Sequence, residues 1–314
     1  MGRILAFIII DLEFNNLSGI HKYIPNVDSD YPNLKKLDLV NEIIEIGAVK
    51  LDIHMQPCEE LKVFIKPSVI PVINPKILDI TKINIKDLEN GVHFIEGLNR
   101  LKSMVNEGDI ICSWAKDDIA EIIRNANHYG YNDLSWINNY LDIQEYVTKI
   151  LGFRKSLSLK NALKALKIKV DEGALHDALN DSIYTAHVFK NVYNARAIKK
   201  YIVEDIYKMP ALEVTSWEGV ELDYNKIKQI CPKCQRKIRV DYPFSVVGWR
   251  FICLGTCTKC NSKILDELIV KKSLCDEEIY KEVATVKDEY DYLRYENKLK
   301  NKVYNQYWIK LRNY

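Results

Sequence analysis

Hydrophobic and polar positions near the start of the chain predict a group of neighbouring strands. Residues 3–10 form an apolar run of strand length that Asp11 closes. Residues 42–52 alternate in strand fashion and should pair with this run, and residues 61–67 indicate a third strand that ends at Pro67. The first run is too short for a membrane span of roughly 20 residues, and no small-residue cleavage site of a signal peptide follows it. We therefore expect a buried strand and a cytoplasmic protein that does not enter a membrane.

Helical and strand patterns then alternate up to about residue 193. A polar stretch at 15–41 is typical of a long loop or an insertion. The following helices are expected at 73–105, from Asp117 or Asp118 to about Tyr129, at 159–166 and at 175–193, with short strands at 109–114 and 141–143. Strands first, and then strands interleaved with helices, predict an α/β domain with a mixed β-sheet flanked by helices over residues 1–195.

The last third of the chain has a different composition. We expect a charged linker at 196–229, a small cysteine-rich domain at 230–270 and a helical C-terminal tail at 271–314. The tail is dense in Glu, Lys, Tyr and Leu and has no Gly or Pro, which favours a helix. Its aromatic residues could stack on nucleic-acid bases, but packing against a domain is the favoured use.

The composition is ordinary apart from one segment in which basic residues gather. The 314 residues are 47% hydrophobic and 28% charged, as in a soluble globular protein, and the net charge is +2. One basic segment has no acidic residue until Asp171. Its members are Lys149, Arg154, Lys155, Lys160, Lys164, Lys167 and Lys169. Such a segment can attract phosphate, although a solvated helix face is the favoured interpretation of a charge run taken alone.

Acidic residues in three distant segments indicate metal chemistry. Asp11 and Glu13 project to the same face of a strand end, because side chains at i and i+2 share a face. Adjacent carboxylates repel each other unless a cation lies between them, and Mg²⁺ or Mn²⁺ prefers such oxygen ligands. A third acid lies at Asp117 or Asp118, and Asp181 is the fourth. Two ions about 3.5–4 Å apart can hold both the attacking and leaving oxygens of a phosphoryl displacement.

One histidine is placed to serve these acids. His176 lies five residues before Asp181, so a helix that begins between them leaves His176 on the preceding loop. A histidine with a pKa near 6.5 can accept a proton from an attacking water at neutral pH. The combined pattern therefore predicts a two-metal phosphodiesterase.

The order and spacing of these motifs resemble the DnaQ-like DEDDh 3′→5′ exonucleases, which have the RNase H-like fold. Further segments extend the resemblance: 42–49 is similar to the second strand of the family, 64–67 to the end of its third, and 157–163 to the helix before its third motif. The resemblance covers roughly residues 4–193 and is closest to the KapD-like and Eri-like branch.

The resemblance implies a role for each matching residue. Two Mg²⁺ or Mn²⁺ ions would be held by Asp11, Glu13, Asp118 and Asp181, with His176 as the general base. Asp118 is preferred over Asp117 because the family's spacing from Trp114 ends on it, and Asp117 could instead cap the helix. The implied reaction is metal-dependent 3′→5′ removal of nucleoside 5′-monophosphates from single-stranded RNA or DNA.

The chain departs from the family pattern at three places. Ala115 stands where the family usually has glycine, and Asp177 and Asn180 add polar or negative groups around the third motif. The insertion at 15–41 follows Glu13, where the terminal nucleotide of the substrate would lie, so we expect it to influence substrate choice. None of these departures removes a catalytic group.

Four cysteines predict a structural zinc site. Cys231 and Cys234 form one CxxC pair, and Cys257 and Cys260 form a second pair 22 residues further on. Thiolates at this spacing on two hairpin knuckles give closed tetrahedral Zn²⁺ coordination, so residues 230–270 are expected to form a zinc ribbon. Cys253 is either a buried neighbour or an alternative ligand in place of Cys257, and the CxxC spacing favours the first.

Other residues of the ribbon suggest a further use. Basic and aromatic residues interleave along it: Lys233, Arg236, Lys237, Arg239, Tyr242, Phe244, Trp249 and Arg250. They could grip phosphates and stack on bases, or the aromatic residues could simply form the small core of the ribbon. Cys58, Cys112 and Cys275 are scattered and are most simply small buried hydrophobic residues.

Two other classes of function remain as alternatives. The first is an exonuclease-fold binding module or adaptor with weak or no catalysis, although all five catalytic-type residues are present. The second is a zinc-ribbon adaptor that binds a protein partner through the ribbon or the C-terminal tail.

Overall fold

The computed structural model describes residues 6–17, 20–34, 39–137, 139–171, 173, 175–213, 221–248, 250–273 and 278–312. The chain divides into two compact units, Met1–Met209 and Pro210–Tyr314. Each unit has its own sheet and its own hydrophobic core. No helix within the described ranges is both long enough and apolar enough to cross a membrane.

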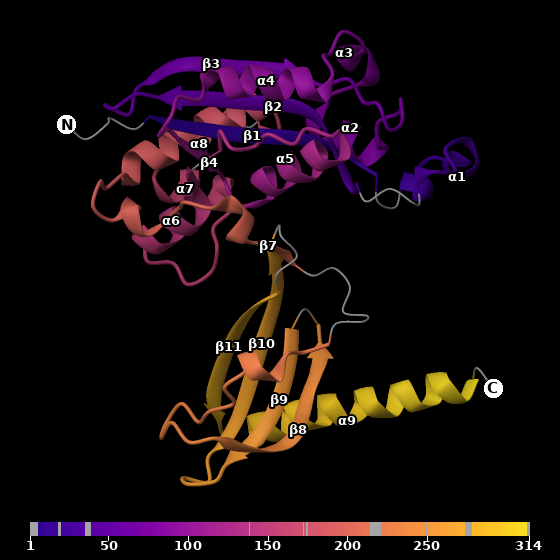
Figure 1. Cartoon of the computed structure of the whole chain (residues 1–314), viewed down its shortest axis with the longest axis vertical. Coiled ribbons are helices and arrows are strands. Elements are labelled where there is room, and N and C mark those ends of the chain that lie inside the picture. The colour runs from indigo at the N-terminus through magenta and orange to yellow at the C-terminus, as the bar shows by residue number, and fades with distance from the viewer. Residues whose placement is uncertain are drawn as a thin grey trace. The chain divides into compact units, whose positions relative to one another are not determined.

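The first unit contains a mixed six-stranded sheet (Figure 1). Its strands are β1 (Phe7–Asn16), β2 (Asn41–Leu51), β3 (Pro57–Phe64), β4 (Ile110–Ser113), β5 (Asn139–Asp142) and β6 (Ile202–Val203). The spatial order is β3-β2-β1-β4-β5-β6, with β1 antiparallel to β2 and parallel to β4. The predicted α/β class with a mixed sheet is therefore confirmed. Residues 196–209, which were expected to be linker, supply β6 and belong to this unit.

Helices cover both faces of this sheet. They are α1 (Val27–Asp30), α2 (Pro75–Thr81), α3 (Ile85–Glu89), α4 (Phe94–Met104), α5 (Asp117–His128), α6 (Ile143–Ile150), α7 (Leu159–Ala165) and α8 (Ala178–Val192). Helix α4 packs on the β2 face that carries Ile46, whereas α8 packs on the opposite face at Gly47. The region 73–105, expected to be helical, contains three helices separated by short turns.

Strand β1 passes from a hydrophobic core to an acidic site along one face. Phe7 and Ile9 lie in the buried cluster that includes Val49 and Phe189. Two and four residues after Ile9, on the same face, come Asp11 and Glu13. The acidic pair therefore lies at the border of an apolar core, where the local dielectric is low.

Glycine at position 47 allows α8 to lie directly on the sheet. Gly47 is the cross-strand partner of Asp11. A methyl group placed on Gly47 would lie 2.1 Å from the carbonyl carbon of Ala178 and 2.2 Å from the amide nitrogen of Leu179. Any side chain at this position would push the first turn of α8 away from the strand. The first turn of α8, which leads to Asp181, is thus fixed next to Asp11.

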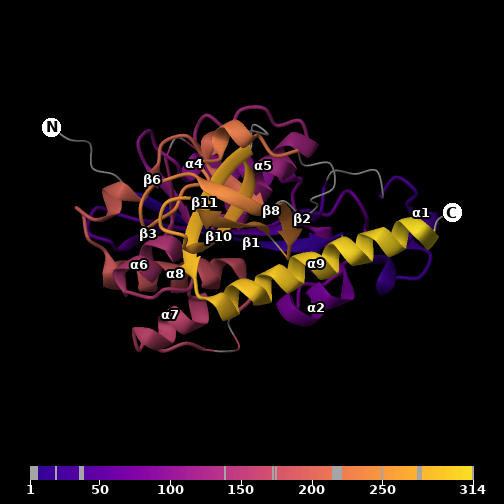
Figure 2. The ribbon, with the colours of Figure 1, turned by 90° about the horizontal axis from the view of Figure 1, so that it is seen from below.

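The second unit is an antiparallel sheet crossed by one helix (Figure 2). It contains β7 (Pro210–Glu213), β8 (Ile238–Val247), β9 (Arg250–Cys257), β10 (Lys263–Ser273), β11 (Glu278–Lys287) and α9 (Glu289–Arg312). The order is β11-β10-β9-β8, and β7 also pairs with β10. On one face, Tyr292 and Leu299 of α9 pack against Ile252, Leu254 and Leu265.

The tail was expected to be helical throughout, and this expectation is wrong for its first part. Residues Glu278–Lys287 form strand β11, which pairs antiparallel with β10 along its length, and α9 begins only at Glu289. The segment contains the β-branched residues Ile279, Val283, Thr285 and Val286. These residues suit a pleated surface, and pairing with β10 overrides the helix propensity of the surrounding Glu and Lys.

Replacing Gly47 by alanine should destabilise the first unit by about 3 kcal/mol, because the new methyl group overlaps the backbone of α8. Urea unfolding followed by circular dichroism measures this loss. Gly173→Ala is the matched control, because among the described residues its added methyl group meets only Asp171 Oδ1 at 3.4 Å. Equal stability of the two variants would contradict the close packing of α8 on β2.

Candidate active site

The sequence-predicted catalytic residues come together at one place in the first unit. Ligand atoms of Glu13, His176 and Asp181 all lie within 4.8 Å of one another. Asp11 interacts electrostatically with Asp118, Asp181 and Glu13, so the remaining two acids belong to the same cluster. Strand β1, the start of α5 and the start of α8 thus each deliver one part of the site.

The two acids on β1 resist ionisation. Burial is the largest cause that raises the pKa of Asp11 well above its usual value, and the charges of Asp118 and Asp181 add to it. The pKa of Glu13 is raised to about 8, first by burial and then by Glu45 and Asp181. Carboxylates so close together in a low-dielectric setting need a proton or a cation among them.

Asp118, rather than Asp117, points into the site. Asp118 is 7% exposed, whereas Asp117 lies on the surface of the first turn of α5. The pKa of Asp118 is raised to about 8 by burial and then by the charge of Asp117. The neighbouring Ser113 side chain and the backbone groups of Asp118 and Leu12 act in the opposite direction and lower this pKa. The buried position agrees with the spacing argument that preferred Asp118.

The turn before α5 has a backbone conformation at position 115 that favours glycine, the residue usual at this position in the family that the sequence resembles. Ala115 has φ 89°, which lies in the left-handed region that glycine adopts freely and alanine does not. Its carbonyl oxygen accepts a hydrogen bond from Tyr140 Oη at 2.6 Å and another from Ser113 Oγ. These two bonds hold the turn in place although the residue is not glycine, so Asp118 still reaches the site.

His176 and Asp181 are joined through the first turn of α8. His176 has φ 66° and is exposed, and its backbone N–H donates to Asp181 Oδ2 at 3.2 Å. Asp177 caps the helix by accepting a hydrogen bond from the N–H of Asn180 at 3.1 Å. Asp181 Oδ1 is buried and has no hydrogen-bond partner among the described residues. Burial raises the pKa of Asp181, so its charged form too would be stabilised by a bound cation.

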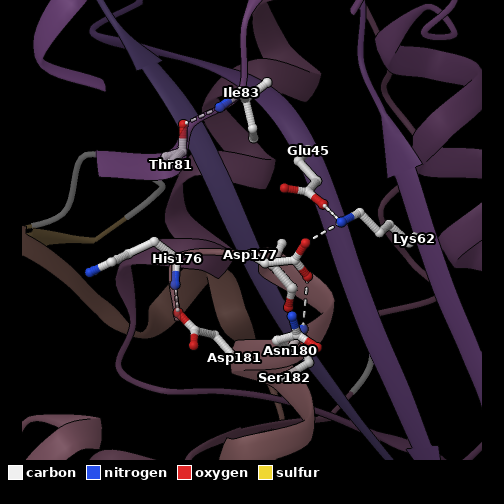
Figure 3. A network of polar contacts seen from close by, with 10 residues as sticks. Glu45, Lys62, Thr81, Ile83, His176, Asp177, Asn180, Asp181 and Ser182 are labelled. Atoms are coloured by element: carbon white, nitrogen blue, oxygen red, sulfur yellow. Dashed lines mark hydrogen bonds and ion pairs between the residues drawn. The ribbon is translucent and has the colours of Figure 1, made fainter. Parts of the chain in front are cut away.

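A fifth acid and a lysine complete the surroundings, and the sequence motifs did not identify them (Figure 3). Glu45 is 1% exposed and lies directly opposite Glu13 in the pairing of β1 with β2. Lys62 Nζ lies 3.1 Å from Glu45 Oε1 and also forms a hydrogen bond with Asp177. Burial nevertheless raises the pKa of Glu45. Glu45 shares its strand face with Gly47, and only the register of the two strands, which no sequence motif specifies, places it opposite Glu13.

The residues present fit hard divalent cations. Every candidate ligand at the site except His176 is a carboxylate, and Mg²⁺ and Mn²⁺ prefer oxygen ligands. The raised pKa values of Asp11, Glu13 and Asp118 have the same origin, namely negative charge collected in a partly buried volume. A bound cation would remove this cost. The exposed imidazole of His176 stands at the solvent side of the same cluster.

The four cysteines of the second unit form a separate group with the geometry of a zinc site. Sγ–Sγ distances are 3.6 Å for Cys231 and Cys260, 3.3 Å for Cys234 and Cys257, and 3.8 Å for Cys234 and Cys260. Tetrahedral Zn²⁺ with Zn–S bonds of about 2.3 Å requires about 3.8 Å between sulfur atoms. The backbone N–H groups of Lys259 and Cys260 also point at Cys257 Sγ, at 3.4 and 3.5 Å. This donor set fits zinc.

Cys253 lies outside this group of four. It is fully buried in β9 beside the group of four cysteines, and its sulfur contacts Gln229 Nε2 at 3.5 Å. Burial raises the pKa of this thiol to about 12, and its sulfur is not among the four whose atoms all lie within 4.8 Å of one another. The structure therefore favours its role as a buried neighbour. Cys275 and Trp249 lie outside the described residues.

Fold and site together define a nuclease of the RNase H-like class. The family model described as exonuclease, RNase_T, matches residues 8–189. The chain therefore belongs to the exonuclease family and is an exonuclease enzyme, and membership implies dependence on divalent metal ions. No curated protein matches the sequence significantly.

Solved structures confirm the fold. The nuclease domain of 3′hExo, a DEDDh family member bound to rAMP, has a TM-score of 0.51 and 16% identity, with 60% of this chain and 92% of that chain covered. A full-length 3′-exonuclease gives the same TM-score and identity over 60% of this chain and 82% of that one. A 3′-exonuclease studied for 3′-end specific recognition of the histone mRNA stem-loop also has a TM-score of 0.51, at 15% identity over 61% and 82%.

Glu13→Gln should stabilise the metal-free protein, and increasingly so as the pH rises. The folded-state pKa of Glu13, about 8, lies above the usual 4.5, so the folded protein holds a proton that the unfolded chain releases. Its contribution is fully present below about pH 4.5 and is lost as the pH rises through about 8, and glutamine escapes this loss. Thermal unfolding without Mg²⁺ or Mn²⁺ should show little difference in Tm near pH 5 and a clear gain near pH 9. Glu60→Gln, on an exposed position of β3, is the control, and an equal gain at all pH values would contradict the account.

Proposed function

We propose that this exonuclease removes nucleoside 5′-monophosphates from the 3′ ends of single-stranded RNA or DNA by a two-metal mechanism. The observation that carries the proposal is the meeting of Glu13, His176 and Asp181 within 4.8 Å, next to Asp11 and Asp118 with raised pKa values. This arrangement provides ligands for cations and a candidate base in one place.

In the proposed mechanism, Asp11, Glu13, Asp118 and Asp181 hold two Mg²⁺ or Mn²⁺ ions. When bound, such ions stabilise the negative charge that develops on the attacking and leaving oxygens of the phosphodiester. The protein supplies the fixed positions of the carboxylates through β1, α5 and α8. Glu45 is held by Lys62 and adds negative charge behind Glu13, which strengthens the demand for cations.

His176 is the proposed general base. Its imidazole lies within reach of Glu13 and Asp181, and the loop before α8 leaves it exposed. It can accept a proton from the attacking water, and the neighbouring carboxylates stabilise the resulting imidazolium. Exposure then allows the proton to pass to solvent. The hydrogen bond from its own backbone N–H to Asp181 keeps base and ligand together.

Two features support a nucleic-acid end as the substrate. Among the similar structures, one contains rAMP and one concerns recognition of an RNA 3′ end, which are properties of those proteins. In this chain, the basic residues between Lys149 and Lys169 are all exposed on α6, α7 and the loops beside them. They precede the His176 loop in the sequence and provide positive charge in a unit whose site is acidic.

We also propose that the cysteine group binds one structural Zn²⁺ and that residues 196–229 include the connection between an exonuclease domain and a zinc-bearing domain. Thiolate ligands require a reducing environment, and the described cysteines are all free. A cytoplasmic location agrees with this chemistry.

Asp118→Asn should lower the turnover number by about 1000-fold or more, because an inward-facing metal ligand is lost. Asp117→Asn is the matched control, since the two residues are adjacent in the same helical turn and only Asp118 is buried. Release of nucleoside 5′-monophosphates from short oligonucleotides, followed by chromatography with Mg²⁺ or Mn²⁺, measures both variants. Equal loss in both, or activity of Asp118→Asn close to that of the wild type, would refute the assignment. Absence of hydrolysis by the folded wild type would favour a binding module.

Cys257→Ser should abolish zinc binding and destabilise the second unit, because a closed tetrahedral site contributes directly to folding. Cys253→Ser should keep one zinc per chain, since Cys253 Sγ lies outside the group of four. Elemental analysis of the two purified variants measures how much zinc each chain holds. Retention of zinc by Cys257→Ser together with its loss from Cys253→Ser would reverse the ligand assignment.

A further inference from the structure

A pocket of about 490 Å³ opens on the second unit, far along the sequence from the catalytic residues. It lies between the segment that leads into the first zinc knuckle and the edge strand β11. Its walls include Lys226, Lys228, Ile230, Tyr280, Lys281 and Glu282. The volume is in the range that accommodates a small organic ligand or one nucleotide. None of the proposed catalytic roles uses this pocket.

Positive charge dominates the walls. Three lysines line the pocket against a single acid, Glu282. Both carboxylate oxygens of Glu282 are occupied, because they accept hydrogen bonds from the backbone N–H groups of Lys228 and Gln229, each at 2.7 Å. Among the described residues, the ammonium groups of Lys228 and Lys281 form no ion pair. The pocket thus presents two unpaired cations, which favours an anionic ligand.

An aromatic ring stands beside these cations. Tyr280 is half-buried, and its hydroxyl accepts a hydrogen bond from the N–H of Asp223 at 3.0 Å and donates one to Glu278 at 2.6 Å. These two bonds fix the orientation of the ring. The ammonium of Lys226 lies 5.5 Å from the ring centroid. A fixed aromatic ring combined with lysines is the arrangement that proteins use to bind single-stranded nucleic acid, with stacking for the base and cations for the phosphate.

The zinc site supports one wall of the pocket. Pro232 and Gln235 belong to the knuckle of Cys231 and Cys234 and also line the pocket. A bound zinc would fix this wall and therefore the spacing between the lysines and Tyr280.

We propose that this pocket binds one nucleotide unit of a single-stranded RNA or DNA, with the phosphate at Lys228 and Lys281 and the base against Tyr280. The site would hold a nucleotide of the same strand that lies upstream of the 3′ end at which hydrolysis takes place. The choice of nucleic acid over an acidic protein rests on the proposed function, because the same chain degrades nucleic acid, and on the aromatic ring. The consequence is tighter binding of long substrates without any change in the chemical step.

The opposite face of the same sheet offers a matched control. Helix α9 covers that face, and its Arg294 and Lys298 are exposed. Replacing Arg294 and Lys298 by alanine removes two positive charges from the unit, as does the double variant Lys228→Ala with Lys281→Ala. All four side chains are exposed, so neither double variant should impair folding.

The test measures binding of a fluorescent 40-nucleotide single strand to the zinc-loaded full chain carrying Asp11→Asn, which prevents digestion. The pocket variant should bind about tenfold more weakly, and the slope of log K against log salt should become less steep by about 0.7, the change for one lost phosphate contact on a single strand. The α9 variant should bind like the parent protein. In the active background, the pocket variant should raise KM for the 40-nucleotide strand and leave the hydrolysis of a dinucleotide unchanged.

Equal affinity and equal salt slope in the two double variants would overturn the pocket assignment, even if the enzyme hydrolyses both substrates. Failure of the wild type to hydrolyse any substrate, combined with pocket-dependent binding, would refute the proposed function and leave the binding site standing. Loss of dinucleotide hydrolysis in the pocket variant would also contradict the proposal, because the site would then act on the chemical step.

Discussion

The contact between Gly47 and the first turn of α8 is the constraint on which the catalytic unit depends. Asp11 pairs with Gly47 across the sheet, and the backbone of Ala178 and Leu179 lies where a side chain of residue 47 would be. The contact places the first turn of α8 on β2, directly beside the Asp11 position of β1. A side chain at position 47 would displace this turn, and with it His176 and Asp181, relative to Asp11 and Glu13. The absence of a Cβ at Gly47 thus allows Asp11 and His176, some 165 residues apart in the sequence, to lie in one site.

The site is built at a cost in electrostatic free energy. Strands β1 and β2 carry an apolar face up to Ile9 and Val49 and then continue on that face with acids. Burial raises the pKa values of Asp11, Glu13 and Asp118, and Lys62 is engaged by Glu45 and Asp177 rather than by these three. A cluster of this kind is stable only with protons or cations, so its instability without metal and its affinity for metal have the same cause. The second unit uses a different donor chemistry, since thiolates at 3.3–3.8 Å suit zinc and not magnesium.

Much of this arrangement could be predicted from the sequence, because the acids follow strands and helix starts at fixed spacings. The pair Asp11 and Glu13, and the preference for Asp118 over Asp117, needed only strand periodicity and a family spacing. The role of Glu45 could not be predicted, since it depends on which residue of β2 faces Glu13. Strand β11 was missed because its Glu and Lys content favours a helix locally, whereas pairing with β10 decides the outcome. The left-handed conformation of Ala115 was also not predicted, because alanine itself does not indicate it. The only sign of it was the glycine that the family usually has at this position.

The most direct test of the central claim is digestion of 5′-labelled single-stranded RNA and DNA, with one set carrying a free 3′ hydroxyl and a second set blocked at the 3′ end. A two-metal exonuclease acting at the 3′ end should produce a ladder that shortens from that end, only with Mg²⁺ or Mn²⁺, and should leave the blocked strands longer. The faster of the two free substrates then identifies the preferred nucleic acid. Metal-independent shortening, or cleavage that ignores the 3′ block and begins inside the strand, would contradict the account.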